Sequence, residues 1–158
     1  MATTSGSTSE RLYSRDVLRL AMSLSEWPFH NRLPRRAELR SATCGSRLRV
    51  EIALDDDDRI SEIGIDAQSC ALGQASAAIL ASRVIGRSRE EIAAGLDTLT
   101  AMLDAAIDPQ DAALIWPGID TLSSAQGLSA RRPSILLPFQ ATIAAIDGLT
   151  QHTGMAGQ

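Results

Sequence analysis

The sequence predicts an α+β fold in which a small antiparallel sheet of about three strands is covered on one face by helices. Two patterns carry this prediction. Residues 47–54 alternate between apolar and polar side chains, which is typical of a strand with one buried face. Apolar side chains recur at helical spacing before this region, in residues 11–25, and again after residue 70. A chain of 158 residues is long enough to bury one core.

Three strands are expected in the middle of the chain. In residues 47–54, the alternation directs the leucine, valine and isoleucine side chains toward the helices and leaves a polar outer face. The aspartates at 55–58 then form a turn, and a second strand follows at 60–66. An earlier strand is expected at 37–42, after a basic linker that contains proline, residues 31–36. Three antiparallel strands make a minimal sheet, which needs a helical cover.

Four helices are expected to supply that cover, at residues 11–25, 70–85, 88–103 and 137–146. Ser88 and Glu91 have the spacing of a capping box, and Gly86 ends the helix before them. Pro138 is expected in the first turn of the last helix, where its missing N–H has no cost. Residues 108–128 contain two prolines and are expected to be a loop with a short turn at 118–122.

The chain is expected to form a single domain. Residues 1–10 are rich in serine and threonine and predict a disordered leader rather than a secretory signal. Residues 11–149 carry the folded domain, and residues 150–158 are expected to be a flexible tail. No apolar stretch is long enough for a membrane span, so we expect a cytoplasmic protein without a membrane partner.

Charge and composition exclude nucleic acid as the main partner. The formal net charge is −4, whereas binding to phosphates requires clustered lysine and arginine. Only 3% of the residues are aromatic, which leaves few side chains on which bases could stack. No pairing of a base with a nucleophile can be identified in the sequence, so we expect a protein that is not an enzyme.

The two cysteines are the strongest candidates for chemistry. Cys44 lies in the segment Thr43-Cys44-Gly45-Ser46, directly before the alternating strand, and Cys70 lies at the start of a predicted helix. Backbone N–H groups at a helix start favour thiolate over thiol. Two interpretations stay open from the residues alone: a functional pair at element boundaries, or two core cysteines in a reducing compartment.

Other candidates have simpler interpretations. The four adjacent aspartates at 55–58 lack the alternating spacing of a calcium loop, and a solvated turn explains them better. His30 and His152 are expected to be solvated surface residues in a linker and a tail. Trp116, in a Trp-Pro-Gly sequence, is expected to be structural, with an anchor for a partner as the alternative.

The order of several motifs resembles the U-type iron–sulfur cluster scaffold proteins, the family of IscU, SufU and the N-terminal part of NifU. Residues 42–46, Ala-Thr-Cys-Gly-Ser, resemble the first cysteine motif of that family. Residues 69–71, and then Ile-Gly-Arg-Ser at 85–88, resemble the second cysteine motif with its helix and following turn. Residues 129–134, Ser-Ala-Arg-Arg-Pro-Ser, resemble the segment with the third cysteine. The long segment after Asp104 is most similar to the SufU branch.

This resemblance implies a NifU-like fold and a site for an iron–sulfur cluster or zinc, with Cys44 and Cys70 as ligands. The family uses three cysteines and a nearby aspartate. This chain has Ser46 where the family has that aspartate, and Ser134 where it has the third cysteine. A neutral hydroxyl is a poor ligand for iron or zinc, and two thiolates do not complete a tetrahedral site. The resemblance therefore implies the fold together with a degenerate cluster site.

Two functions follow as hypotheses. In the first, the chain is a scaffold-like carrier that holds or relays a cluster, a metal or sulfur through its cysteine thiolates. In the second, it is an interaction or regulatory module of the same machinery that binds no metal. In both, the expected partners are a cysteine desulfurase or other iron–sulfur assembly proteins.

Overall fold

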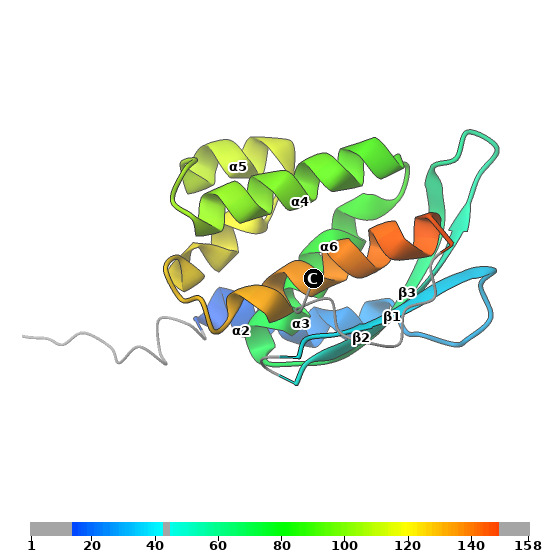
Figure 1. Ribbon diagram of the computed structural model, residues 1–158, viewed down its shortest axis with the longest axis horizontal. Helices are drawn as coiled ribbons and strands as arrows, with labels where there is room; N and C mark the ends of the chain where they lie inside the picture. The colour runs from blue at the N-terminus through cyan, green and yellow to red at the C-terminus, as the bar shows by residue number, and fades with distance from the viewer. Residues whose placement is uncertain (1–13, 43–44, 149–158) are drawn as a thin grey trace, which may run out of the picture.

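The computed structural model describes residues 14–42 and 45–148 (Figure 1). The expected leader at 1–10, the expected tail at 150–158, His152 and Cys44 lie outside these ranges. In chain order the elements are α2 (Arg15–Ser23), the 3-10 helix η1 (Leu24–Glu26), β1 (Arg35–Arg40), β2 (Arg47–Leu54), β3 (Ile60–Gln68), α3 (Ala71–Val84), α4 (Arg89–Leu103), α5 (Pro109–Ile115), the 3-10 helix η2 (Ile119–Ala125) and α6 (Arg132–Ile146). No helix in the described part is long and apolar enough to cross a bilayer.

The sheet is antiparallel with the order β1-β2-β3, as predicted. The alternating segment 47–54 is β2 with the predicted bounds, and β3 extends two residues beyond the expected end. The first strand begins at Arg35, inside the expected linker, and ends at Arg40 instead of residue 42. It starts earlier because the ladder with β2 continues to the pair of Arg35 and Ile52, two residues before the end of β2.

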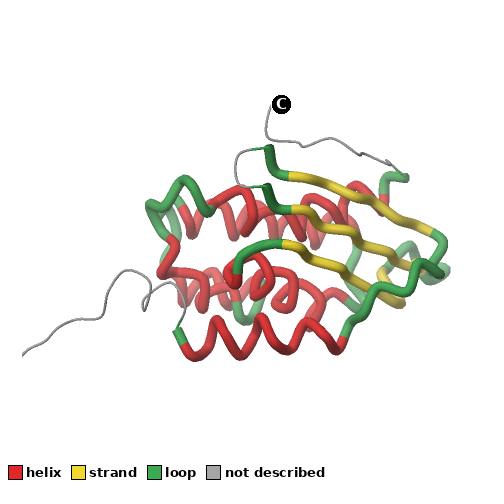
Figure 2. Tube along the Cα trace, turned by 90° about the horizontal axis from the view of Figure 1, so that it is seen from below, coloured by secondary structure: helices red, strands yellow, loops and turns green. Residues whose placement is uncertain are grey.

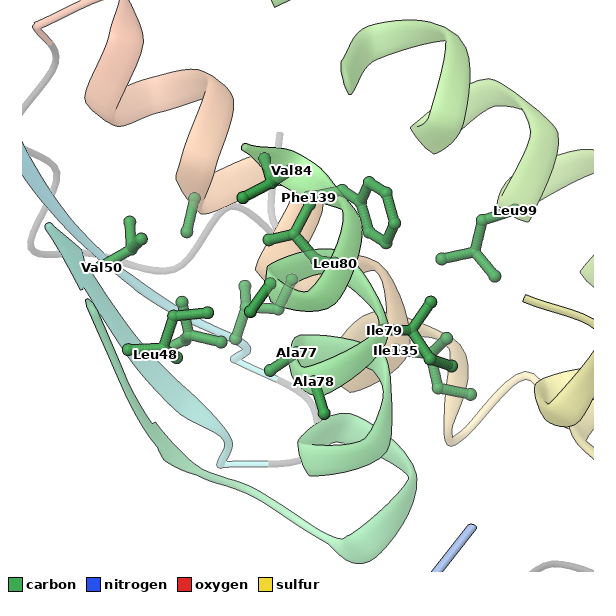
Figure 3. Close-up of a cluster of buried hydrophobic side chains, with 14 of the residues drawn as sticks. Leu48, Val50, Ala77, Ala78, Ile79, Leu80, Val84, Leu99, Ile135 and Phe139 are labelled. Carbon is green, nitrogen blue, oxygen red and sulfur yellow. The ribbon is translucent and has the colours of Figure 1, made fainter. Parts of the chain in front are cut away.

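The inner face of the sheet packs against α3 and α6, with α4 and α5 behind them (Figures 1 and 2). Leu48, Val50 and Ile52 of β2 are almost completely buried, as the alternation predicts. Ile65 of β3 lies opposite Val50 and is buried on the same face. Helix α3 is apolar on nearly all sides because it lies between the sheet and the outer helices (Figure 3).

The contact between α3 and α6 is close because the residues that face α6 are small. Ser76, fully buried in α3, donates a hydrogen bond from Oγ to the carbonyl oxygen of Ile135 in α6, at 2.6 Å. One turn earlier, Gly73 leaves no room for a side chain: a Cβ there would lie 2.4 Å from Ser69 Oγ and 3.2 Å from the Ser134 carbonyl oxygen. These two positions fix how near the N-terminal turns of the two helices approach.

Helix α6 differs from the prediction. It begins at Arg132 rather than residue 137, and Pro133 occupies its first turn. Pro138 therefore lies inside the helix and cannot donate the usual backbone bond to the Ser134 carbonyl. Such a proline costs about 3 kcal/mol in an isolated helix, but here it is buried with its neighbours in the core, and burial of an apolar helix outweighs that cost.

The predicted loop at 108–128 is wrong, since it contains α5 and η2. Pro109 is a start signal rather than a breaker, because the first turn of a helix needs no N–H at that position. The Asp108 side chain caps the helix by accepting the N–H of Gln110 at 2.8 Å. Gly118, with φ of 98°, then turns the chain from α5 into η2.

Trp116 is structural, and the alternative of a partner anchor is wrong. Its side chain is fully buried, and its Nε1 donates to the carbonyl oxygen of Ile79 at 3.1 Å. The ring meets Phe139 edge-on at 5.2 Å between centroids. A Cβ at Gly95 would lie 2.6 Å from the indole, so this glycine in α4 provides the space that the ring fills.

The alternation predicted a polar and exposed outer face of the sheet. Part of this face is instead buried. Glu51 is only 1% exposed, because the segment before β1 crosses over it. Its carboxylate accepts backbone N–H groups from His30 at 2.9 Å, Arg32 at 2.7 Å and Leu33 at 3.2 Å. Burial by itself raises the pKa of Glu51, but the three N–H groups and the nearby Arg32 charge outweigh it, so the pKa lies below its ordinary value.

This carboxylate should therefore contribute stability that depends on pH. The pKa is lower in the folded state, so the contribution is complete above the unfolded value of about 4.3 and is lost as pH falls through the folded value. Replacing Glu51 by Gln puts an NH₂ group among N–H donors. We expect Glu51→Gln to lower the free energy of unfolding by about 2 kcal/mol at pH 7, measured by urea denaturation.

The difference between the wild type and Glu51→Gln should shrink as the pH is lowered below about 4. Glu62→Gln is the matched control, because Glu62 lies on the same outer face and makes a surface ion pair with Arg32. This control should lose less than about 1 kcal/mol. Equal losses in the two variants, or a difference that does not depend on pH, would contradict a buried, ionised anchor.

Candidate functional site

The candidate site lies at one end of the sheet. Arg40, Arg47 and Gln68 are neighbours across the three strands, so the turn after β1 and the residues after β3 leave the sheet side by side. The turn is closed by bonds from Ser41 N to Ser46 O at 2.8 Å and from Gly45 N to Ser41 O at 3.1 Å. Gly45 has φ of 72°, a conformation that other residues rarely adopt, which explains the glycine after Cys44.

Cys70 is the residue between β3 and α3. It occupies the N-cap position of α3 and is partly exposed, and its sulfur makes no capping bond to the helix. The sulfur instead lies 3.6 Å from the hydroxyl oxygen of Ser134, which is in the first turn of α6. Two residues that are 64 positions apart in the sequence therefore meet at the N-terminal ends of two adjacent helices.

Ser134 is buried, with 2% of its surface exposed. Its hydroxyl donates to the carbonyl oxygen of Arg131 at 3.0 Å, so its proton is already used within the helix start. Ser46, 4% exposed, lies across from these residues on the turn after β1. Together they line one pocket of about 180 Å³, formed by Gly45, Ser46, Gln68, Ser69, Cys70, Arg131 and Ser134.

The structure thus brings together the described members of the set predicted from the sequence. Cys70, Ser134 and Ser46 border the same pocket. Cys44 lies outside the described residues, although the next residue, Gly45, lines the pocket. Whether Cys44 and Cys70 act as ligands stays a prediction.

The donor set in the described ranges does not fit a closed zinc site. Apart from the Arg131 cation, it consists of one thiol, from Cys70, the hydroxyls of Ser46, Ser69 and Ser134, and the side-chain amide of Gln68. Within residues 14–42 and 45–148, no three side chains among histidine, cysteine, aspartate and glutamate are grouped so that they could hold a metal ion. Structural zinc needs four thiolate or imidazole ligands, which these residues do not supply.

Sequence reasoning missed Arg131. It precedes α6 and lines the pocket beside Ser134, where it is the one cation among the lining residues that the structure describes. The signal was available, since Arg131 lies in the Arg-Arg-Pro-Ser segment that led to Ser134. Arg131 lies at the pocket because α6 begins at the next residue. With the predicted helix start at residue 137, Arg131 would not have been placed at the start of the helix.

Comparison with known proteins decides the family. The family model described as "NifU-like N terminal domain" matches residues 28–112, which is more than half of the chain. The chain belongs to the NifU-like N-terminal domain family. The U-type scaffold resemblance and the α+β fold predicted from the sequence are therefore confirmed. The match includes both cysteine segments and ends before Ser134.

Named relatives agree with this family. The chain is 29% identical over 72 residues to an iron-sulfur cluster assembly scaffold protein IscU from Streptococcus pyogenes serotype M1, a match that spans 46% of this chain and 45% of that protein. The crystal structure of a nitrogen-fixing NifU-like protein (N-terminal) from Brucella abortus has a TM-score of 0.77 and 25% identity, and the match covers 90% of this chain and 97% of that one.

A second solved structure has nearly the same similarity. It is a putative iron-sulfur cluster assembly scaffold protein for the SUF system from Fervidobacterium islandicum AW-1, with a TM-score of 0.76 and 18% identity, covering 87% of this chain and 98% of that one. The TM-scores of 0.77 and 0.76 do not separate the branches within the family.

The helix contact that holds Cys70 against Ser134 can be tested with two serines of α3. Ser76→Ala removes the buried bond to Ile135, and we expect it to lower the free energy of unfolding by about 1 kcal/mol. Ser82→Ala is the matched control, because the exposed Ser82 hydroxyl bonds only to Ile79 in its own helix. Its effect should be within about 0.5 kcal/mol. Equal effects in urea denaturation would contradict the importance of the bond between helices.

Proposed function

We propose that this chain is a carrier of the iron–sulfur assembly machinery that holds or relays a cluster, a metal or sulfur through the thiolates of Cys44 and Cys70. The observation that carries the proposal is the meeting of Cys70 and Ser134 in a pocket bordered by Gly45 and Ser46. These are the positions at which the resemblance to the scaffold family expects its ligands. The same resemblance suggests a cysteine desulfurase or other assembly proteins as partners, and a non-enzymatic role in the cytoplasm.

The chemistry of the pocket favours relay over storage. Two thiolates leave a tetrahedral metal half-coordinated, and a neutral hydroxyl that already donates to a carbonyl adds little. The remaining ligands of a bound cluster or metal would come from a partner protein or a small thiol. Arg131 adds a positive charge beside the pocket, which suits a cargo that becomes negatively charged when thiolates bind it. Such a cargo leaves readily when the outside ligand is withdrawn.

The second candidate is a metal-free module that binds assembly partners through the retained fold. The observation in its favour is the state of Ser134, which is buried and hydrogen-bonded to Arg131 without needing a metal. A buried hydroxyl with a partner is a stable arrangement in itself. The two candidates differ in a measurable property, the amount of metal and sulfide per chain.

We expect protein purified without oxygen to contain iron and sulfide only when a thiol such as glutathione is present. Iron, zinc and acid-labile sulfide are measured per chain, in the wild type and in Cys44→Ser and Cys70→Ser. If the chain is a carrier, the bound iron and sulfide should depend on the added thiol and should be lost in both variants. Absence of cargo under all conditions would contradict the carrier and favour the metal-free module. Tight binding of one zinc or cluster without added thiol would mean that another residue completes the site.

Restoring the two ligands that the family uses should convert weak binding into stoichiometric binding. We expect the double variant Ser46→Asp with Ser134→Cys to bind one zinc per chain, because it has three cysteines and one carboxylate. Binding at a concentration 100 times the Kd would raise the free energy of unfolding by about 2.7 kcal/mol, measured with and without zinc. Without metal the same variant should be less stable than the wild type, because position 46 is buried and an unpaired carboxylate is costly there.

The control for this gain is Ser46→Asn with Ser129→Cys. Asparagine has the shape of aspartate without the charge, and Ser129 is exposed outside the pocket. The control adds one thiol outside the pocket and a neutral amide in place of the carboxylate, and it lacks the thiol at position 134, so zinc should not stabilise it. Equal stabilisation of both variants by zinc would show that the metal does not bind at the pocket.

A further inference from the structure

On the outer edge of β1, the backbone groups have no partner among the residues that the structure describes. In β1 and β2, the bond from Ser41 N to Ser46 O sets the alternation of the ladder, so Leu39 and Ala37 bond to β2. The N–H and C=O groups of Arg36, Glu38 and Arg40 consequently point away from β2. Within residues 14–42 and 45–148, no other segment pairs with these groups, and β1 lies at the side of the sheet in Figure 2.

The opposite edge of the sheet is covered in part. On β3, the N–H of Ile65 donates to the carbonyl oxygen of Trp27 at 2.8 Å, and Pro28 forms a bridge to the same residue. Within the described residues, the chain thus pairs part of the β3 edge with its own backbone, and none of it pairs with the β1 edge. An open edge is a template on which another extended chain can pair.

The open edge is positively charged on a chain whose net charge is −4. Arg35, Arg36 and Arg40 are exposed on it. The guanidinium groups of Arg35 and Arg36 bond to neutral oxygens: Arg35 to the carbonyl of Ile146 at 2.7 Å, Arg36 to the side chain of Asn31 at 2.8 Å. Arg40 is the one of these three arginines that bonds to a carboxylate, that of Glu38, at 3.2 Å. Among the described residues, Arg35 and Arg36 therefore carry positive charge on this edge without an ion pair to a carboxylate, whereas Arg40 is partly neutralised by Glu38.

Charge on an edge strand commonly serves to prevent aggregation, and here it would repel a second copy of the same strand. The same positive charge would attract an acidic strand. We propose that the β1 edge binds an extended acidic segment of a partner protein, which adds a fourth strand to the sheet. Backbone hydrogen bonds to Arg36, Glu38 and Arg40 hold the segment, and the arginines select its charge.

The position of this surface gives the added strand access to the candidate site. β1 ends at Arg40, and the turn that follows carries Gly45 and Ser46 to the pocket. A segment paired along β1 ends beside that turn. The partner would then be aligned with the place where Cys70 lies, without contacting the pocket itself.

The binding test uses a labelled peptide in which glutamate alternates with valine, and the full chain as the receptor. We expect fluorescence anisotropy to show binding that weakens at high salt, and at least about tenfold weaker binding of a lysine–valine peptide of the same length. Two N-methylated peptides separate strand pairing from simple charge attraction. Methylation of alternate amides blocks one edge of the peptide, and shifting the methyl groups by one residue blocks the other edge. One of them should bind at least about tenfold more weakly than the other.

Variants of the chain locate the surface. Arg36→Glu with Arg40→Glu should weaken binding at least about tenfold. Arg15→Glu with Arg19→Glu makes the same change in net charge on exposed residues of α2 and should leave binding unchanged. Glu38→Pro removes an N–H that points away from β2, so the ladder to β2 stays intact while peptide binding falls. If this variant does not fold, the methylated peptides carry the same test.

Several results would overturn the proposal. No binding of the acidic peptide would do so, as would equal binding of both methylated peptides, since either result means that no strand is added. Equal weakening by the α2 control variant would mean that only net charge matters. A dimer in sedimentation experiments that Glu38→Pro dissolves would identify a second copy as the occupant.

Discussion

The close approach of α3 to α6 is the constraint on which the candidate site depends. It is set by a fully buried hydroxyl, Ser76, bonded to the Ile135 carbonyl, and by the missing side chain of Gly73. Because both helices begin at the same end of the sheet, a small interhelical distance brings their first turns together. The Cys70 sulfur then lies 3.6 Å from the Ser134 hydroxyl. A larger residue at position 73 would separate the two helix starts, and with them the two side chains.

The sheet supports this arrangement from the other side. Glu51 fixes the segment before β1 across the outer face by accepting three backbone N–H groups, so the sheet is covered where no helix lies. The buried Trp116 fills the space over Gly95 between α4, α5 and α6. The sheet is supported on both sides. Side chains in the turn closed by Ser41 and Ser46, and at the start of α3, can therefore differ without a change in the fold. Ser46 and Ser134 carry hydroxyls at that end, and both are buried beside Cys70.

Much of the fold was predictable because local patterns and tertiary packing agree. The period of residues 47–54 predicted the bounds of β2, since one face is buried at Leu48, Val50 and Ile52 and partly buried at Leu54. The Ser88–Glu91 capping box is formed as predicted, because it is a local interaction. Predictions failed at two prolines: Pro109 was treated as a loop signal, and Pro138 was expected only in the first turn of a helix. Pro109 begins α5, and Pro138 is tolerated inside α6 because the core holds that helix on several sides.

The sequence alone therefore determined the strand that faces the helices, the family resemblance and the identity of the candidate residues Cys70, Ser46 and Ser134. It did so because periodicity, caps and motif order are local along the chain. Only the tertiary structure decided that Cys70 meets Ser134, that Arg131 joins their pocket, and that Glu51 is buried under the segment before β1. Each of these contacts joins segments far apart in sequence or depends on where a helix begins, and side-chain packing rather than local propensity sets those positions.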